Sequence, residues 1–285
     1  MTRKVKIKKY SGDIVDFEME KLKNSLRNSH ANEALINEIT EQVEKKLFNG
    51  ISTRKIYQMA FQMLKKKTNV CASRYKLKKA IMELGPSGFP FEKFVGAILT
   101  EEGFQTEVGI FVPGKCVMHE VDVVAKTDHT EYMVECKYHN TQGKISDVKV
   151  PLYIHSRFLD INEKLKNDPK SMHKFQQGWI YTNTRFSSDA IAYGKCVGLN
   201  LVGWDYPHHD SLKFKIDTLG LFPITALITL TRKEKEKLLN QGIVLCKELV
   251  QNQHKLDEIG IEKSKQKKIV ENARGLCLSK QKEYM

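Results

Sequence analysis

The sequence predicts an α/β protein with more than one domain. Its 285 residues are enough for two or three domains of about 100–200 residues each. Apolar residues follow two periods, the alternation of strands and the i, i+3, i+4 spacing of amphipathic helices. We expect an N-terminal β-hairpin with a helical cluster, a central mixed sheet flanked by helices, and a C-terminal helical region.

Charge and turn signals divide the chain at the same places. Residues 1–84 hold 19 Lys or Arg and 9 Asp or Glu, residues 85–205 hold 13 and 15, and residues 206–285 hold 15 and 10. A Gly-Pro-Ser-Gly turn and a later polar break separate the three parts. We expect domains at 1–84, 86–205 and 206–285. The formal net charge of +13 indicates an anionic partner.

Two classes of protein are disfavoured. The longest apolar stretch, Leu219 to Leu230, contains Pro223 and is shorter than the roughly 20 residues that a membrane span needs. The basic first ten residues do not resemble a secretory signal. The six cysteines form no CxxC pair, so we expect reduced thiols, no zinc site and a cytoplasmic protein.

The first basic segment predicts a hairpin followed by helices. Lysines alternate with Val5 and Ile7, which favours a strand over 4–9 with one cationic face. A turn around Gly12 returns the chain into a second strand. Helical spacing and a Ser-Thr cap then predict helices over about 19–29, 32–47, from 53 onward, and 72–84.

This segment resembles the ATP-cone domain of ribonucleotide reductases and their transcriptional repressors. The resemblance covers residues 3–84 and rests on the strand, the Gly12 turn, the Glu-Lys-Leu step at 20–22, Gly-Ile-Ser-Thr at 50–53 and Ala-Ser-Arg-Tyr at 72–75. It implies that ATP or dATP binds as an allosteric ligand. The implied binding residues are Lys8, Lys9, Lys21 and Thr53. Lys8-Lys9 departs from the family's Lys-Arg pair, and a solvated lysine face is the alternative.

The middle segment predicts carboxylates on neighbouring strands. A helix is expected over 89–102, followed by strands over 104–112, 115–125 and 131–138. Alternate strand residues share a face, so Glu120 lies with Asp122, and Glu135 lies with Lys137. Adjacent buried carboxylates are costly unless a cation neutralises them, and oxygen ligands suit Mg²⁺ or Mn²⁺. A helix over 146–165, a strand at 178–182, a helix over 187–196 and a last strand complete the sheet.

Residues 86–205 resemble the PD-(D/E)xK nuclease superfamily, particularly its Mrr-like restriction endonucleases, related to type IV enzymes, and the archaeal-type Holliday-junction resolvases. The matching residues are Glu92, Asp122, Glu135 and Lys137. The resemblance implies phosphodiester hydrolysis, with Asp122, Glu135 and the Cys136 backbone carbonyl holding the metal. Glu92 would orient water or complete a second metal site, and Lys137 would position the attacking water or stabilise charge. His119, His139 and His155 flank the site, and we expect structural or supporting roles for them.

The C-terminal segment predicts a basic helical region. Gly242-Ile243 and Gly260-Ile261 each follow a short helical run and resemble helix-hairpin-helix turns, which bind DNA backbone without reading bases. Gly242, Gly260, Lys263 and Lys265 are the candidate DNA-binding residues. The alternative is a helical bundle that packs against the sheet or forms a dimer.

Together these features predict a DNA endonuclease, dependent on Mg²⁺ or Mn²⁺ and regulated by ATP or dATP. DNA and the nucleotide are the expected partners, and a homo-oligomer, dimer or tetramer, is expected because cone domains often change oligomeric contacts. Restriction of foreign DNA is the first role considered. The alternatives are a Holliday-junction-type resolvase or repair nuclease, and a nucleotide-responsive DNA-binding regulator with an inactive nuclease fold.

Overall fold

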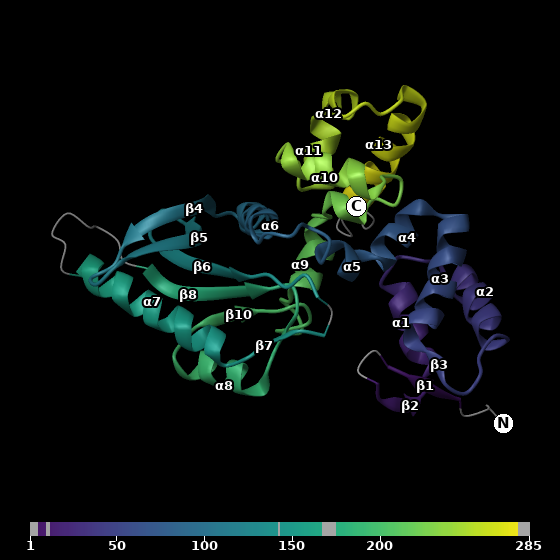
Figure 1. Cartoon of the computed structure of the whole chain (residues 1–285), viewed down its shortest axis with the longest axis horizontal. Coiled ribbons are helices and arrows are strands. Elements are labelled where there is room, and N and C mark those ends of the chain that lie inside the picture. The colour runs from purple at the N-terminus through teal and green to yellow at the C-terminus, as the bar shows by residue number, and fades with distance from the viewer. Residues whose placement is uncertain (1–4, 10–11, 142, 167–174, 279–285) are drawn as a thin grey trace.

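The computed structural model of this chain describes residues 5–9, 12–141, 143–166 and 175–278 (Figure 1). Within these residues the strands form sheets of three, five and two strands, and helices pack around them. The protein is therefore a mixed α/β chain, as the sequence predicts. Three residues of the predicted N-terminal hairpin, Lys4, Tyr10 and Ser11, lie outside the described residues.

The N-terminal segment has its own apolar core, at the right in Figure 1. Its elements are β1 (Lys6–Lys8), β2 (Ile14–Asp16), α1 (Met19–Arg27), α2 (Glu33–Glu44), β3 (Ile51–Ser52), α3 (Thr53–Lys67) and α4 (Asn69–Tyr75). β1 pairs antiparallel with β2, which confirms the predicted hairpin, and parallel with β3. Asn32 and Ser52 accept backbone N–H bonds that begin α2 and α3.

The helix predicted over 72–84 is wrong in one respect, because the chain forms two helices there. α4 ends at Tyr75, and α5 (Leu77–Ile81) follows after Lys76. Ala72 packs in the N-terminal core, whereas α5 packs in the central one. A straight helix could not serve both cores, so the chain bends between them. Thr225 Oγ1 then donates to the Ala80 carbonyl at 2.7 Å.

The central sheet has the strand order β10-β8-β6-β5-β4. Its strands are β4 (Gln105–Pro113), β5 (Met118–Lys126), β6 (Glu131–Lys137), β8 (Phe175–Thr182) and β10 (Asn200–Val202). β4, β5 and β6 are antiparallel neighbours, and β6, β8 and β10 are parallel. Val123 pairs with Val134, which fixes the register that places Asp122 beside the end of β6.

Helices cover both faces of this sheet (Figure 1). α7 (Lys149–Lys166) and α8 (Ser188–Cys196) pack on one face, and α6 (Phe89–Glu101) and α9 (Leu212–Leu219) pack on the other. The helix expected from 146 begins three residues later. The two residues Ile145 and Ser146 form β7 (Ile145–Ser146), which pairs with β9 (Arg185–Phe186).

The C-terminal helices share the core of the central sheet. They are the 3₁₀ turn η1 (Ile224–Ala226), α10 (Arg232–Asn240), α11 (Cys246–Gln251), α12 (His254–Glu258) and α13 (Lys263–Cys277). Their buried residues form one cluster with α5, α6 and α9. The division at residue 205 stays a prediction, and the shared core means that both sides of it pack as one body.

One buried arginine joins the N-terminal segment to the C-terminal helices. The Arg74 guanidinium pairs with Asp217 at 2.8 Å and donates to the carbonyls of Leu276 and Leu278. It also lies over the Phe222 ring. The end of α4 is thus fixed to both α9 and the end of α13.

Two findings bear on the excluded classes. Among the described residues, no helix is both long and apolar enough to cross a membrane. All six cysteines are free thiols.

Candidate active site and nucleotide pocket

The antiparallel pairing of β5 and β6 brings the two predicted metal carboxylates together. Asp122 is half-buried on β5, and its Oδ2 accepts the backbone N–H of Cys136 at 2.6 Å. Glu135 precedes Cys136 on β6 and is 6% exposed. Burial, followed by repulsion from Asp122, raises the pKa of Glu135 to about 8. Burial also raises the pKa of Asp122.

Glu92 faces the same group of carboxylates from α6. Burial raises its pKa to about 7, and the charges of Asp122 and Glu120 add to that rise. Glu92 also raises the pKa of Glu135. One helix and two strands therefore supply carboxyl groups that influence one another's ionisation. We call Glu92, Glu120, Asp122 and Glu135 the acidic edge.

Lys137 lies at the exposed end of β6, two residues after Glu135. It lines two cavities. One, of about 330 Å³, also contacts Glu135, Lys149 and Tyr153. The other, of about 280 Å³, extends past His139 to Asn140 and Thr141. Lys137 can therefore reach a molecule bound beside the acidic edge.

Arg157 of α7 is a residue of this site that the sequence analysis did not identify. Its guanidinium pairs with Glu135 Oε2 at 2.6 Å and donates to the backbone carbonyl of Glu120. Both partners of the ion pair have little exposed side chain. Nothing in the sequence indicates which carboxylate a single Arg of an amphipathic helix will contact.

The fit of a divalent cation depends on the oxygens of this edge. Within residues 5–9, 12–141, 143–166 and 175–278, no three His, Cys, Asp or Glu side chains are grouped closely enough to hold a metal. The set available here is two carboxylates and the Cys136 carbonyl. Glu135 Oε1 is buried and has no hydrogen-bond partner among the described residues. A buried acceptor without a donor, in a cluster of carboxylates, suits a hard cation.

The three flanking histidines have structural contacts. His119 Nε2 pairs with Asp160 at 2.7 Å, and this bond lowers the pKa of Asp160 to about 2. His139 bonds to Ser146 Oγ at 3.0 Å, and His155 bonds to the Tyr193 hydroxyl at 2.9 Å. These bonds hold α7, β7 and α8 in place around the edge.

Three of the four predicted nucleotide-binding residues line one cavity in the N-terminal segment. Lys9, Lys21 and Thr53 surround a space of about 230 Å³. Its walls combine apolar and aromatic side chains, including Tyr57 and Tyr75 stacked at 4.9 Å between ring centroids, with two carboxylates, Asp16 and Glu18. Lys8 is exposed on β1 and does not line this cavity. Strand alternation turns Ile7 inward and Lys8 outward.

The two glycine turns of the C-terminal region have the same backbone geometry. Gly242 and Gly260 have φ of 81° and 80°, and each N–H bonds to the carbonyl three residues before it. The N–H of the next isoleucine bonds five residues back in both turns. The positive φ explains why glycine stands at both places.

The predicted DNA-binding lysines beside these turns are ion-paired. Lys263 contacts Asp257 at 2.6 Å, and Lys265 contacts Glu234 at 2.6 Å. After the first turn, Glu248 accepts the N–H groups of Val244 and Leu245. α13, after the second turn, has no side-chain cap among the described residues. The amides after the first turn are therefore already bonded within the protein.

Comparisons with known proteins find one family model, one relative and one solved structure that are similar to this chain. Residues 222–277 match the family model described as AF1548-like, C-terminal. An uncharacterized protein of Archaeoglobus fulgidus is 36% identical over 178 residues, which are 62% of this chain and 96% of that protein. The crystal structure of AF1548, described as a protein of unknown function, matches with a TM-score of 0.55 and 34% identity. The matched region covers 67% of this chain and 98% of the AF1548 chain. The chain belongs to the AF1548-like family.

Proposed function

We propose that this protein is a metal-dependent DNA endonuclease regulated by ATP or dATP. The proposal takes the central sheet as a restriction-endonuclease-like fold and the N-terminal segment as an ATP-cone. The observation that carries it is the buried, unpaired Oε1 of Glu135 beside Asp122, with Lys137 next to it on the strand. Buried carboxyl groups with displaced pKa values are typical of functional sites.

The residues of the acidic edge have distinct roles in this proposal. Asp122, Glu135 and the Cys136 carbonyl would hold Mg²⁺ or Mn²⁺, which supplies Lewis acidity when bound. Glu92, which faces these carboxylates from α6, would orient the attacking water or complete a second metal site. Lys137 would donate to that water or to a phosphate oxygen. Arg157 orients the Glu135 carboxylate through its ion pair.

The regulatory part of the proposal rests on the cavity lined by Lys9, Lys21 and Thr53. Two lysines and the beginning of α3 suit the phosphates of a nucleotide, and the two stacked tyrosines suit a base. We expect the protein to act in the cytoplasm as a dimer or tetramer whose assembly responds to nucleotide. Restriction of foreign DNA is the role that we propose first, and junction resolution or repair is the alternative.

One observation favours a second candidate, a nucleotide-responsive DNA-binding regulator without catalysis. The Arg157 guanidinium already occupies Glu135 Oε2. A fixed cation at that oxygen could replace the metal rather than assist it. The two candidates differ in whether the acidic edge needs a divalent ion to act.

The test is cleavage of supercoiled plasmid and of branched DNA, with Mg²⁺ or Mn²⁺ and with or without ATP or dATP. Wild type is compared with Asp122→Asn and Lys137→Met, and with Lys164→Met, an exposed lysine on α7, as the control. Metal-dependent cutting that the first two variants lose and the control keeps supports the nuclease. DNA binding with no cutting under either metal favours the regulator. Preference for branched over plasmid DNA would identify a resolvase.

A further inference from the structure

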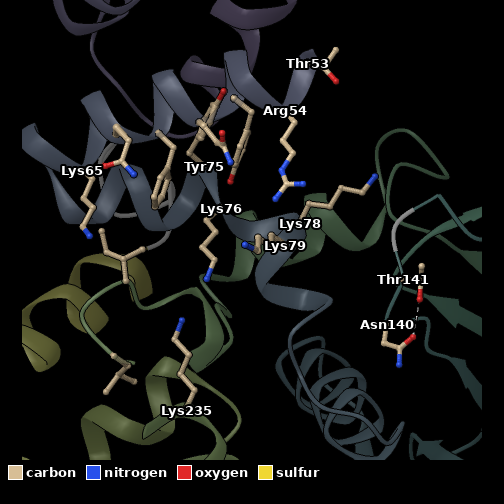
Figure 2. A pocket seen from close by; sticks show the side chains of 16 residues that line it. Thr53, Arg54, Lys65, Tyr75, Lys76, Lys78, Lys79, Asn140, Thr141 and Lys235 are labelled. Atoms are coloured by element: carbon tan, nitrogen blue, oxygen red, sulfur yellow. Dashed lines mark hydrogen bonds between the residues drawn. The ribbon is translucent and has the colours of Figure 1, made fainter. Parts of the chain in front are cut away.

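A large basic cleft lies where the N-terminal segment, the central sheet and the C-terminal helices meet (Figure 2). It has a volume of about 910 Å³. α3 supplies one wall, the α4–α5 bend a second, and the η1–α10 segment a third. Asn140 and Thr141, which follow β6, close one side. Residues from all three segments of the chain therefore line one space.

The described lining of this cleft carries positive charge alone. Its cations are Arg54, Lys65, Lys76, Lys78, Lys79 and Lys235, and Asp and Glu are absent from among the described lining residues. Glu83 lies outside the lining and contacts Lys76 at 2.8 Å and Lys79 at 3.7 Å. In the described part of the chain, Arg54, Lys65 and Lys78 form no ion pair with a carboxylate. Uncompensated cations in a concave site attract an anion.

Lys235 shows how strongly charge is concentrated there. It is 7% exposed and donates to the Thr225 carbonyl at 2.7 Å. Figure 2 shows its side chain and that of Lys76 pointing toward one another. Burial, followed by the charge of Lys76, lowers the pKa of Lys235 to about 7. A bound anion would offset both the burial of the Lys235 ammonium and its repulsion from Lys76.

Aromatic rings stand among these cations. Tyr57, Phe61 and Tyr75 line the cleft. Tyr57 stacks with Tyr75 at 4.9 Å and with Phe61 at 6.2 Å between centroids. A positively charged groove lined in part by aromatic side chains is the arrangement that binds single-stranded nucleic acid, because phosphates meet the cations while bases pack against the rings.

The cleft adjoins a second cavity that contains Lys137, the lysine beside the acidic edge. Asn140 and Thr141 line both the basic cleft and the 280 Å³ cavity that holds Lys137. A ligand that extends past these two residues contacts Lys137 at one end and α3 at the other. An extended polyanion meets this requirement, whereas a compact anion would occupy the cleft alone.

We propose that the basic cleft binds one strand of the nucleic acid whose phosphodiester is presented at the acidic edge. The choice of a nucleic-acid strand rests on the proposed function. The strand runs from Lys137, past Asn140 and Thr141, along Lys78 and Lys79 to the face of α3 that carries Arg54 and Lys65. Most of the affinity for the DNA backbone therefore resides in this cleft, and the glycine turns contribute less.

The same helix also borders the nucleotide cavity. Thr53, Tyr57 and Tyr75 line both spaces. A nucleotide in the smaller cavity would therefore contact the wall that holds the strand, which gives it a direct route to altered DNA affinity.

The experiment measures DNA binding without catalysis. Fluorescence anisotropy follows a labelled oligodeoxythymidine of about 16 nucleotides binding to the full chain in EDTA, over a range of salt. Lys65→Glu/Lys79→Glu is compared with Lys46→Glu/Lys195→Glu, which changes the net charge equally at exposed lysines outside the cleft. We expect about a tenfold or greater reduction of affinity in the cleft variant alone. We also expect its salt slope to fall by about 0.7 for each phosphate that the variant no longer neutralises.

Each outcome decides the proposal. Equal reductions of affinity in the two double variants would overturn it and leave only general attraction to net charge. Unchanged DNA binding with abolished ATP binding in the cleft variant would instead identify the cleft as part of the nucleotide site. If DNA binding depends on the cleft but the protein cuts no DNA, the cleft is a DNA-binding site and the proposed nuclease activity is wrong. Melting curves of all variants show whether each is folded.

Discussion

The acidic edge and the basic cleft bury opposite charges in different ways. Glu135 and Lys235 are 6% and 7% exposed, and burial is the first cause of the pKa displacement in both. Glu135 has the counter-ion Arg157 at 2.6 Å. Lys235 has a neutral carbonyl at 2.7 Å and a like charge, Lys76, beside it. The fold thus gives the buried Glu135 a counter-ion, whereas the buried Lys235 has a neutral acceptor in its place.

The largest effect should come from breaking the acidic edge. We expect Asp122→Asn and Glu135→Gln each to reduce DNA cleavage by about 10²–10³-fold, because each removes a charged ligand from the transition state. Initial rates on labelled duplex at saturating Mg²⁺ measure this. Their DNA affinity in EDTA should change little, since the proposed strand contacts lie in the cleft. A fall in binding equal to the fall in cleavage would contradict that separation.

Removing Arg157, the counter-ion of Glu135, tests how much this ion pair stabilises the fold. Arg157→Met should lower the free energy of unfolding by about 3 kcal/mol, because Glu135 is left buried without its partner. The same substitution made with Glu135→Gln should cost far less. Urea unfolding of the four proteins gives the coupling energy.

The control for that cycle is Arg232→Met. Arg232 forms an exposed i,i+4 pair with Glu236 at 2.9 Å, and its removal should cost less than about 0.5 kcal/mol. Equal costs at the two arginines would mean that the Arg157–Glu135 pair stabilises no more than a surface ion pair does.

The buried lysine should make stability depend on pH. The folded-state pKa of Lys235 is lowered from 10.5 to about 7, so its contribution is complete above pH 10.5 and is lost as pH falls toward 7. Lys76 adds to that lowering, whereas Glu83 and Cys246 oppose it. Lys235→Met should flatten the profile between pH 10 and pH 7 by on the order of 3 kcal/mol. Denaturant midpoints at both pH values measure the change. Lys46→Met, at an exposed site, should keep the wild-type slope.

The smallest effect concerns the nucleotide cavity. Lys21→Ala should weaken ATP or dATP binding by about tenfold, or about 1.4 kcal/mol, because one phosphate is left without its cation. Stability should change by less than about 0.5 kcal/mol, because its pair with Glu18 is exposed. Calorimetric titration compares it with Lys23→Ala, which lies on the same helix outside the cavity. Equal nucleotide affinity in the Lys21→Ala and Lys23→Ala variants would show that Lys21 does not contact the nucleotide.

Much of the fold follows from local pattern. Strand alternation and the short gap between the strands expected over 104–112 and 115–125 predict the β4–β5–β6 meander, and so predict that Asp122 and Glu135 lie on neighbouring strands. Helical spacing predicts α6 and its Glu92. The glycine turns also occur where the repeated Gly-Ile places them. These features depend on residues that are close in sequence or paired by register.

The remainder depends on how distant elements pack. Arg157 meets Glu135 because α7 crosses the sheet at one particular position, and no spacing in the sequence encodes that crossing. The basic cleft needs residues near 54–79, 140 and 235 to converge, and each group alone resembles a solvated basic surface. The bend at Lys76 arises because α4 packs in the N-terminal core and α5 packs in the central core.

The Arg74 contacts have a consequence for the order in which this chain folds during synthesis. The apolar core of residues 5–72 can close as soon as that segment leaves the ribosome. The central core includes residues up to Leu276, and Arg74 bonds to the carbonyl of Leu278. At about 5–20 residues per second, translation separates these events by roughly 10–40 s. The nascent chain would thus present the cavity at Lys9, Lys21 and Thr53 before the core that supports the acidic edge is complete.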